Sequence, residues 1–279
     1  MKKISRRSFL AAAGLSVAAL ALTACGGSSA STASSVASSA AASEAASTSA
    51  VAGELTTVEA GKLTMATNAT FPPYEMTTDA GDIEGIDVET AQAIADKLGL
   101  ELQIDDMDFD AALLSVQQGK ADIVMAGVTV TDERKAVMDF SDSYATGIQS
   151  IIVPEGSDIA SPDDLAGKKI GTQRGTTGYI YCSDDFGDDA VVAYDNGLTA
   201  VQALNNGQVD AVVIDNAPAK EYVAANPGLA ILDTSYAEED YAIGMAKGSS
   251  LEAAVNAALE ELKADGTLQA IVDKYITAE

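Results

Sequence analysis

The sequence contains no histidine among its 279 residues. Histidine is the side chain that most often acts as a general base near neutral pH, and it is the commonest metal ligand. Its absence excludes Cys-His and Ser-His-Asp chemistry. We therefore expect no catalytic residue, no metal site and no cofactor.

Cysteine and positive charge are also scarce. With only two cysteines, Cys25 and Cys182, the chain cannot build a disulfide framework, so its stability must come from packing. We expect Cys182 to be a small buried apolar residue. The 42 acids against 16 lysines and arginines give a net charge of −26, which argues against nucleic acid and anionic lipid surfaces as partners.

Long apolar runs are missing too. The longest, Phe9 to Leu22, is too short to span a bilayer comfortably, but it follows a basic start and ends in small residues, as an export signal does. Leu22-Thr23-Ala24-Cys25 resembles the lipobox of bacterial lipoproteins, so residues 1–25 are predicted to be a lipoprotein signal peptide that is lipidated at Cys25. The alternative is a plain cleaved signal peptide with an incidental cysteine.

The export route stays open, because Ser5-Arg6-Arg7-Ser8-Phe9-Leu10 also resembles a twin-arginine motif. Residues 26–53 are almost entirely Gly, Ser, Ala and Thr, and such a segment cannot bury enough apolar surface to fold. We predict a disordered tether that leaves the rest of the chain free to move above a membrane face.

From Glu54 onward, about 226 residues remain, enough for two lobes with real cores. Short apolar runs alternate with helical patterns in this part, which is typical of an α/β fold. Strands are predicted over 63–66, 100–104, 123–126, 148–153, 169–172, 191–194 and 211–214, with helices near 88–98, 109–117, 198–205, 251–263 and 268–275. The first of these helices should end at a Gly99 cap. A short helix should begin at Ser161-Pro162-Asp163-Asp164, with Ser161 as N-cap and proline at its first position.

Four loops at the ends of predicted strands are candidates for a binding site, because ligands of open α/β sheets sit where strands end. Asn68 to Glu75 displays aromatic and polar groups on a backbone stiffened by two prolines. Gly127 to Arg134 contains Thr131 as a predicted helix N-cap and places Arg134 one turn into the helix. On this segment alone, an arginine at this position is more often a solvated surface charge.

The other two loops follow later strands. Gly175-Thr176-Thr177-Gly178 precedes a helical stretch, a geometry in which backbone N–H groups and the helix dipole point at an anion such as a carboxylate. A purely steric need for glycine is the alternative. Asp215 ends the strand 211–214, where it either faces the crevice or caps a helix that starts near Pro218.

Together these segments resemble the polar amino-acid-binding proteins of ABC importers, the bacterial extracellular solute-binding proteins of family 3. The resemblance covers nearly all of residues 55–279, and several motifs recur in the family's order and spacing. They are Asn68 to Glu75, Gly85-Ile86-Asp87-Val88, Gly127 to Arg134, Asp139-Phe140-Ser141, Gly175 to Gly178 and Gly207 to Ala211.

The resemblance implies a role for each site residue. Arg134 should bind the ligand α-carboxylate, helped by backbone N–H groups of Thr129 and Thr177 in turns that also hold Thr176. Asp215 should accept from the α-ammonium, with the Gly127 carbonyl and the Thr129 hydroxyl. This is independently sensible, since a planar guanidinium matches a carboxylate and an acid matches an ammonium.

The side-chain end of the ligand is less well specified. The resemblance implies that the rings of Phe71 and Phe109 sandwich the ligand side chain, while Asn68, Tyr74, Glu75 and Gln173 line or border it. Members that bind cationic side chains often carry an acid where this chain has Asn68, and Ile214 replaces a polar residue of some relatives. A polar neutral or a cationic amino acid therefore remains open.

The implied fold is α/β, a type II-like periplasmic-binding-protein fold in which each of two lobes is a mixed sheet flanked by helices. Residues 54–146 and 242–279 would form lobe 1 and residues 147–241 lobe 2, with hinges near Tyr144 and Tyr241. We expect a monomeric extracytoplasmic lipoprotein that delivers a free amino acid to an ABC permease. The alternatives are an enzyme on the same scaffold, either a dehydratase or a murein-cleaving relative, and a ligand-sensing or adhesive surface lipoprotein.

Overall fold

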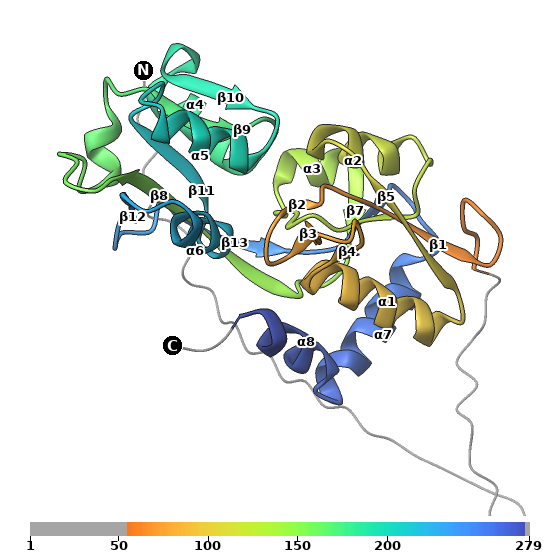
Figure 1. The fold of residues 1–279 in the computed structure, drawn as a ribbon. Coiled ribbons are helices and arrows are strands. Elements are labelled where there is room, and N and C mark those ends of the chain that lie inside the picture. Colours follow the sequence, from red (N-terminus) through yellow and green to blue (C-terminus); the bar gives the residue numbers. More distant parts are fainter. Residues whose placement is uncertain (1–54, 277–279) are drawn as a thin grey trace, which may run out of the picture. The chain divides into compact units, whose positions relative to one another are not determined.

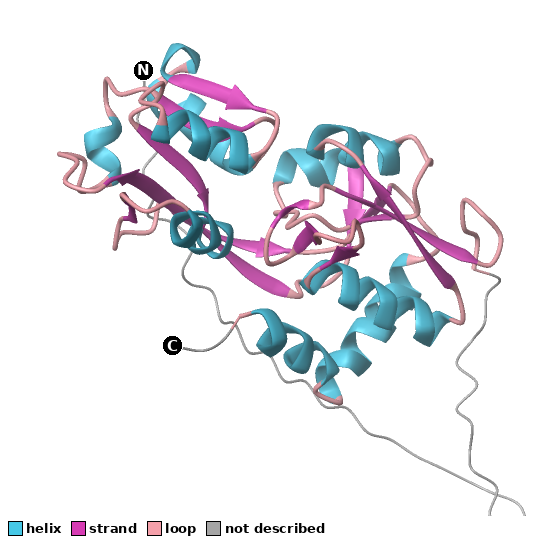
Figure 2. Cartoon of the chain, in the orientation of Figure 1, coloured by secondary structure: helices cyan, strands magenta, loops and turns pink. Residues whose placement is uncertain are grey.

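The structure is a computed structural model that describes residues 55–276. Its elements divide into two lobes, each built on its own mixed sheet with helices against it, as Figures 1 and 2 show. The predicted signal peptide, Cys25 and the predicted tether lie outside the described residues. Over the part of the chain that is described, we find no helix long and apolar enough to cross a membrane.

The sheet of the first lobe has five strands in the order β5-β1-β6-β14-β7. β1 runs parallel to β5 and β6, whereas β14 runs antiparallel to β6 and β7. The strands are β1 (Lys62–Thr67), β5 (Glu101–Asp106), β6 (Ile123–Val124), β7 (Met138–Phe140) and β14 (Gly244–Ala246).

Four of the five helices of the first lobe bury one apolar face each. In α1 (Ile86–Leu98), Ala91, Ile94 and Ala95 are buried, and the helix ends at Gly99, whose φ of 69° is the left-handed cap predicted from the sequence. The same core takes in the C-terminal helices, and the helices of this lobe are α1, α2 (Phe109–Gln117), α3 (Asp132–Val137), α7 (Glu252–Ala264) and α8 (Thr267–Tyr275).

The sheet of the second lobe has the order β10-β9-β11-β8-β12, with β13 also pairing with β8. Its first three strands are parallel to one another, and β8 is antiparallel to β11, β12 and β13. The strands are β8 (Ala145–Pro154), β9 (Ile170–Gln173), β10 (Val191–Tyr194), β11 (Ala211–Asp215), β12 (Leu229–Ile231) and β13 (Ala237–Tyr241).

Three α-helices and two short 3-10 helices accompany this sheet. The predicted short helix with proline at its first position is η1, and Ser161 and Asp164 form a capping box at its start. Cys182 is buried in α4 against the strands of this lobe. The helices are α4 (Thr177–Phe186), α5 (Gly197–Asn205), α6 (Asn216–Ala225), η1 (Pro162–Leu165) and η2 (Asp188–Ala190).

The chain passes between the two sheets at the neighbouring ends of β8 and β13. Ala145 of β8 pairs with Tyr241 of β13, and both strands extend from this point into the second lobe (Figure 1). The Tyr241 side chain is 1% exposed, and its backbone also forms a bridge to Thr129. Tyr241 thus lies where the first lobe, the second lobe and the loop before α3 meet.

Some elements have no counterpart in the sequence-based prediction. The segment after β1 folds into a small antiparallel sheet of β2 (Thr70–Phe71), β3 (Glu75–Thr77) and β4 (Ile83–Glu84). These strands are two or three residues long, too short for an alternating pattern to be visible in the sequence. The Pro72-Pro73 peptide bond within this segment is cis.

Candidate functional site

One cavity lies between the two lobes, with about 430 Å³ of empty volume including open solvent. Its walls come from strand ends and loops of both sheets, as expected for open α/β sheets. All ten site residues predicted from the sequence line it. The lining residues are Asn68, Phe71, Glu75, Phe109, Ala126, Gly127, Thr129, Arg134, Gln149, Gln173, Thr176, Thr177, Val213, Ile214, Asp215 and Tyr241.

Arg134 is buried beside this cavity, so the surface-charge interpretation of this residue is wrong. Its side chain is held by two backbone carbonyls: Nη1 donates to Thr129 O at 2.7 Å and Nη2 donates to Gly175 O at 3.1 Å. The guanidinium stands 5.4 Å from the ring centroid of Phe109. The predicted cap is also present, since the Thr131 hydroxyl accepts from the Arg134 backbone N–H. Burial lowers the pKa of the Arg134 guanidinium.

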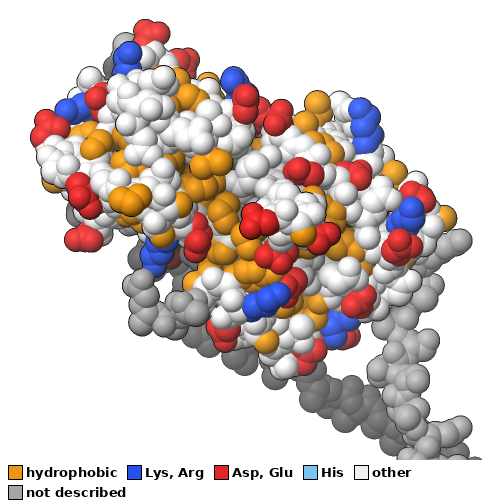
Figure 3. Space-filling model, in the orientation of Figure 1, with side chains coloured by type: hydrophobic (Ala, Val, Ile, Leu, Met, Phe, Trp, Pro, Cys, Tyr) orange, Lys and Arg blue, Asp and Glu red, His pale blue; other side chains and the backbone are white. Residues whose placement is uncertain are grey.

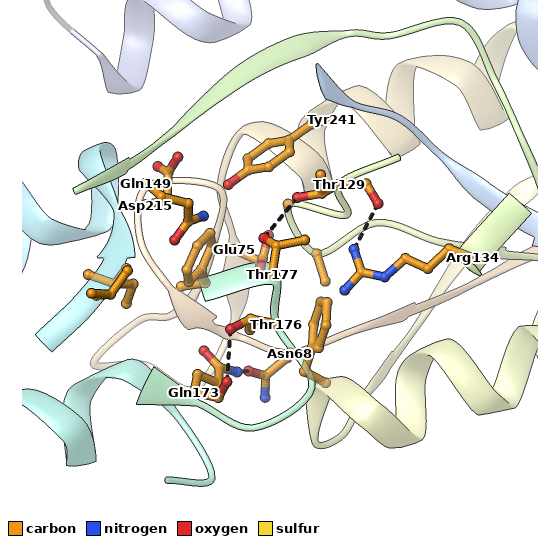
Figure 4. Close-up of a pocket in the computed structure, with 16 residues that line it drawn as sticks. Asn68, Glu75, Thr129, Arg134, Gln149, Gln173, Thr176, Thr177, Asp215 and Tyr241 are labelled. Atoms are coloured by element: carbon orange, nitrogen blue, oxygen red, sulfur yellow. Dashed lines mark hydrogen bonds between the residues drawn. The ribbon is translucent and has the colours of Figure 1, made fainter. Parts of the chain in front are cut away.

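Asp215 lies on the opposite side of the cavity from Arg134 (Figure 4). Its carboxylate accepts from the backbone N–H of Ile148 at 2.8 Å and of Ala217 at 2.9 Å, and the second contact makes it the N-cap of α6. Both interpretations of Asp215 therefore hold, although the helix starts at Asn216 rather than near Pro218. Burial raises the pKa of Asp215 to about 6, against the lowering effect of these N–H groups.

Hydrogen bonds join the two lobes around the cavity. Gln173 Nε2 donates to Asn68 Oδ1 at 3.0 Å, and the hydroxyls of Thr129 and Thr177 lie 3.4 Å apart (Figure 4). Together with the contact from Arg134 to Gly175, these bonds hold the lobes closed against each other.

The turn at Gly175 agrees with both interpretations of the sequence, the steric need for glycine and the helix start suited to an anion. Gly175 has a φ of 73°, and a Cβ there would meet the Asp110 carboxylate, so glycine is sterically required. The turn also opens α4, whose N-cap Thr176 accepts from the Tyr179 N–H. The free N–H groups of this first turn therefore lie at the cavity edge, where an anion would be stabilised.

The aromatic residues of the first loop have different environments. Phe71 and Phe109 line the cavity as predicted, whereas Tyr74 is not among the lining residues. Its ring packs against Tyr241 at a centroid distance of 5.4 Å, within the core of the first lobe. Tyr74 supports the wall of the cavity from behind.

Glu75 is the most unusual lining residue. Its side chain is 0% exposed, and no N–H or hydroxyl group of the described residues donates to its carboxylate oxygens; it can hydrogen-bond to the neighbouring Asp87 carboxylate only when one of the two acids carries a proton. Burial raises the pKa of Glu75 well above its ordinary value, and the negative charge of Asp87 raises it further. A buried acid is normally either paired with a cation or neutral, so Glu75 should hold a proton as long as no cation lies beside it.

Two polar lining residues, Gln149 and Tyr241, were not among the predicted site residues, and neither was Glu239, which contacts the lining residues Gln149 and Thr129. Gln149 interrupts the apolar run of β8, a pattern that could have drawn attention to it, and its amide donates to Glu239 Oε2 at 3.0 Å. Glu239 also accepts from the Thr129 hydroxyl at 3.0 Å. Tyr241 was predicted only as a hinge. Glu239 and Tyr241 belong to β13, which was missing from the prediction.

Known proteins resemble this chain over most of its length. The chain is 34% identical over 276 residues to a protein of Neisseria gonorrhoeae named a probable histidine-binding protein, covering 96% of this chain and 95% of the relative. A family model described as bacterial extracellular solute-binding proteins, family 3, matches residues 63–278.

Solved structures agree on the fold. The arginine-, lysine-, histidine-binding protein ArtJ from Geobacillus stearothermophilus is similar with a TM-score of 0.75 and 35% identity, covering 78% of this chain and 96% of that one. An ancestral arginine-binding protein bound to glutamine is similar with a TM-score of 0.75 and 43% identity, over 78% of this chain and 99% of that one. The predicted α/β, two-lobed periplasmic-binding-protein fold is confirmed, and the chain belongs to the bacterial extracellular solute-binding proteins of family 3.

Proposed function

We propose that this protein captures a free amino acid with a cationic side chain in the cavity between its lobes and delivers it to an ABC importer. The observation that carries the proposal is the placement of two opposite charges, Arg134 at 9% exposure and Asp215 at 2%, on opposite sides of one cavity. A zwitterion presents a carboxylate to the first and an ammonium to the second.

The side chain of Arg134 is held in a position suited to binding a carboxylate. Its two contacts to Thr129 O and Gly175 O use two of its five N–H donors and fix the plane of the guanidinium. The remaining donors can accept a planar carboxylate, and the N–H groups at the start of α4 add to them. Asp215 keeps lone pairs free beyond its two backbone contacts, so it can also accept from an ammonium.

The side-chain end of the ligand favours a cation. Asn68 is neutral, but Glu75 places a buried carboxyl group in the cavity wall, and no described residue donates a hydrogen bond to it. Phe71 and Phe109 offer ring faces that bury methylenes and attract a cation. The relatives named above as binding arginine, lysine or histidine support the same class of ligand.

Relatives of this chain are named as binding proteins, which favours binding over catalysis on the same scaffold. The importer role follows from the family. The proposal also includes a monomeric state and a lipid anchor on Cys25. It places the lobe limits at 146/147 and 241/242, with hinges near Tyr144 and Tyr241. The acidic side chains that are spread over the face in Figure 3 suit a partner other than an anionic surface.

The test is a measurement of melting temperature with each proteinogenic amino acid. The purified protein is first unfolded and refolded to remove any ligand carried through purification. An amino acid at a hundredfold over its Kd adds about 2.7 kcal/mol to stability, so arginine, lysine or histidine should raise the melting temperature clearly. If no amino acid shifts it, the proposal fails; if only neutral ones do, the cationic preference fails.

Delivery needs a test in cells. Deletion of the gene should abolish uptake of the amino acid that shifts the melting temperature, and the wild-type gene should restore it. Undiminished uptake would instead support the ligand-sensing role. Replacement of Cys25 by alanine tests the anchor, because an unlipidated protein should move from the membrane fraction to the soluble one.

A further inference from the structure

Glu75 and Asp87 form a pair of buried acids at the cavity, in which Glu75 lines the wall and Asp87 does not. Glu75 lies on β3 and Asp87 in the first turn of α1, and both side chains are 0% exposed. Asp87 has donors: the Gly127 N–H at 3.0 Å and the Tyr144 hydroxyl at 2.7 Å. Glu75 has none among the described residues.

Within the part of the chain that the structure describes, no positive charge is found to act on Glu75. Glu75 interacts electrostatically with two acids, Asp87 and Asp106, and with three tyrosines, Tyr74, Tyr144 and Tyr222. The buried cation of the cavity, Arg134, is directed to two backbone carbonyls. Two ionised carboxylates next to each other in such a place would repel strongly, whereas one proton between them supplies the missing donor.

We propose that Glu75 and Asp87 form a proton-binding site, in which the two carboxyl groups share one proton when the cavity is empty and release it when the cation of a basic amino acid binds. The inference rests on the proposed function and adds a regulation of that site. The exchange conserves charge at the pair: one proton leaves for solvent, and one ligand cation takes its place.

The ionisation behaviour of both acids agrees with this geometry. Burial, followed by the charge of Asp87, raises the pKa of Glu75 well above its ordinary value. Burial raises the pKa of Asp87 to about 6, although the Gly127 N–H and the Tyr144 hydroxyl act in the opposite direction. Glu75 is thus the group that keeps the proton at neutral pH.

The consequence is a ligand preference that depends on pH. Because binding of a cationic side chain releases a proton, its affinity should rise with pH, by up to about tenfold per pH unit while the empty site is protonated. An amino acid with a neutral side chain leaves the proton in place, so its affinity should change little over the same range. Discrimination between arginine and glutamine should therefore increase as the pH rises.

Isothermal titration calorimetry tests the exchange. L-arginine is titrated into the protein near neutral pH in phosphate and in Tris, which differ in ionisation enthalpy, so that the difference in measured heat gives the protons released. We expect about one proton per arginine and much less for L-glutamine, whose release reports the α-groups alone. Glu75→Gln should reduce the value for arginine to that for glutamine, and the exposed-acid control Glu84→Gln should leave it unchanged.

Arginine binding with no more proton release than glutamine binding would overturn the proton site and leave the proposed function intact. Infrared spectroscopy of the ligand-free protein gives a readout that needs no ligand. The carbonyl stretch of a protonated carboxyl group should be present near neutral pH, absent in Glu75→Gln, and retained in Glu84→Gln. Absence of this band in the wild-type protein overturns the proposal even if no basic amino acid binds.

Discussion

At the scale of single residues, Arg134 shows how burial changes the meaning of a charge. Nothing in its local sequence distinguishes it from a solvated arginine on a short helix. In the structure, its guanidinium lies between Thr129 O, Gly175 O and the Phe109 ring, out of contact with most solvent. A charge held in this way interacts strongly with a buried ligand carboxylate.

Replacing Arg134 by alanine should weaken amino-acid binding by roughly 2 to 5 kcal/mol, or about 30-fold to several thousand-fold. The ligand carboxylate would be left without its charged partner in a buried site. Calorimetry measures the change. Arg174→Ala is the matched control, because that side chain is 56% exposed and pairs with the exposed Asp195 at 3.7 Å. Equal affinity in the Arg134 variant would remove Arg134 from the binding site.

Asp215 makes a second prediction, on pH. Burial raises its pKa to about 6 in the ligand-free fold, above the ordinary value of 3.8, so the folded state holds a proton that the unfolded chain has already lost. This contribution to stability is complete below the ordinary value and disappears as the pH rises through about 6, and two pKa units correspond to about 3 kcal/mol.

Asp215→Asn cannot titrate, so this part of the pH dependence should vanish. The free energy of unfolding, from urea titrations of the ligand-free protein at about pH 4 and about pH 7, measures the difference. Asp184→Asn, an exposed acid in the same lobe, should behave as the wild type. A wild-type pH dependence in Asp215→Asn would show that the carboxyl group is ionised throughout.

At the scale of elements, α3 has six residues, too few to be stable on its own, and it carries Arg134. Its start is fixed by the Thr131 side chain, which accepts from the Arg134 N–H. A capping contact and a ligand contact thus depend on the same residue through its backbone and its side chain.

Thr131→Ala should destabilise the protein by about 1 kcal/mol and also weaken binding, because the cap holds the backbone that aims Arg134. Asn196→Ala removes a comparable cap at the start of α5, where Asn196 accepts from the Thr199 N–H, and Asn196 does not line the cavity. It should lose similar stability without losing affinity. Urea unfolding and calorimetry separate the two effects, and equal affinities in both variants would contradict the role assigned to the α3 cap.

At the scale of the whole folded part, contacts between the lobes should contribute to the affinity for a ligand. The Tyr222 hydroxyl on α6 donates to Thr70 O on β2 at 2.5 Å, a bond between the lobes that does not involve the cavity lining. A ligand that binds the closed form better than the open form gains from every contact that already favours closure.

Tyr222→Phe should weaken amino-acid binding by about 0.5 to 1.5 kcal/mol, the net contribution of one hydrogen bond. It should also make the ligand-free protein more expanded in small-angle X-ray scattering. Tyr236→Phe is the control, since its hydroxyl donates to Asp185 within the second lobe at 2.6 Å. If both variants bind alike, the bond to Thr70 does not contribute to closure.

Much of this molecule could be predicted from local patterns. The strands and helices with clear periodicity, the Gly99 and Thr131 caps and the proline-started turn of η1 depend on neighbours in sequence, so composition and spacing reveal them. The ten cavity residues were found through family motifs, which preserve the spacing of loops. The strands β2 and β3 were missed because they are too short to show a pattern, and β12 and β13 were missed because they form through pairing with β8, which is distant in the sequence.

The sequence by itself determined the absence of histidine chemistry, the α/β alternation and which loops follow strand ends, because each depends on composition or on short spacing. Only the tertiary structure decided that Arg134 is buried, that Asp215 both caps α6 and faces the cavity, and that Glu75 stands without a donor beside Asp87. The physical reason is that burial, pairing and desolvation are set by residues brought together from far apart in the chain, and these set the charge that each acid carries.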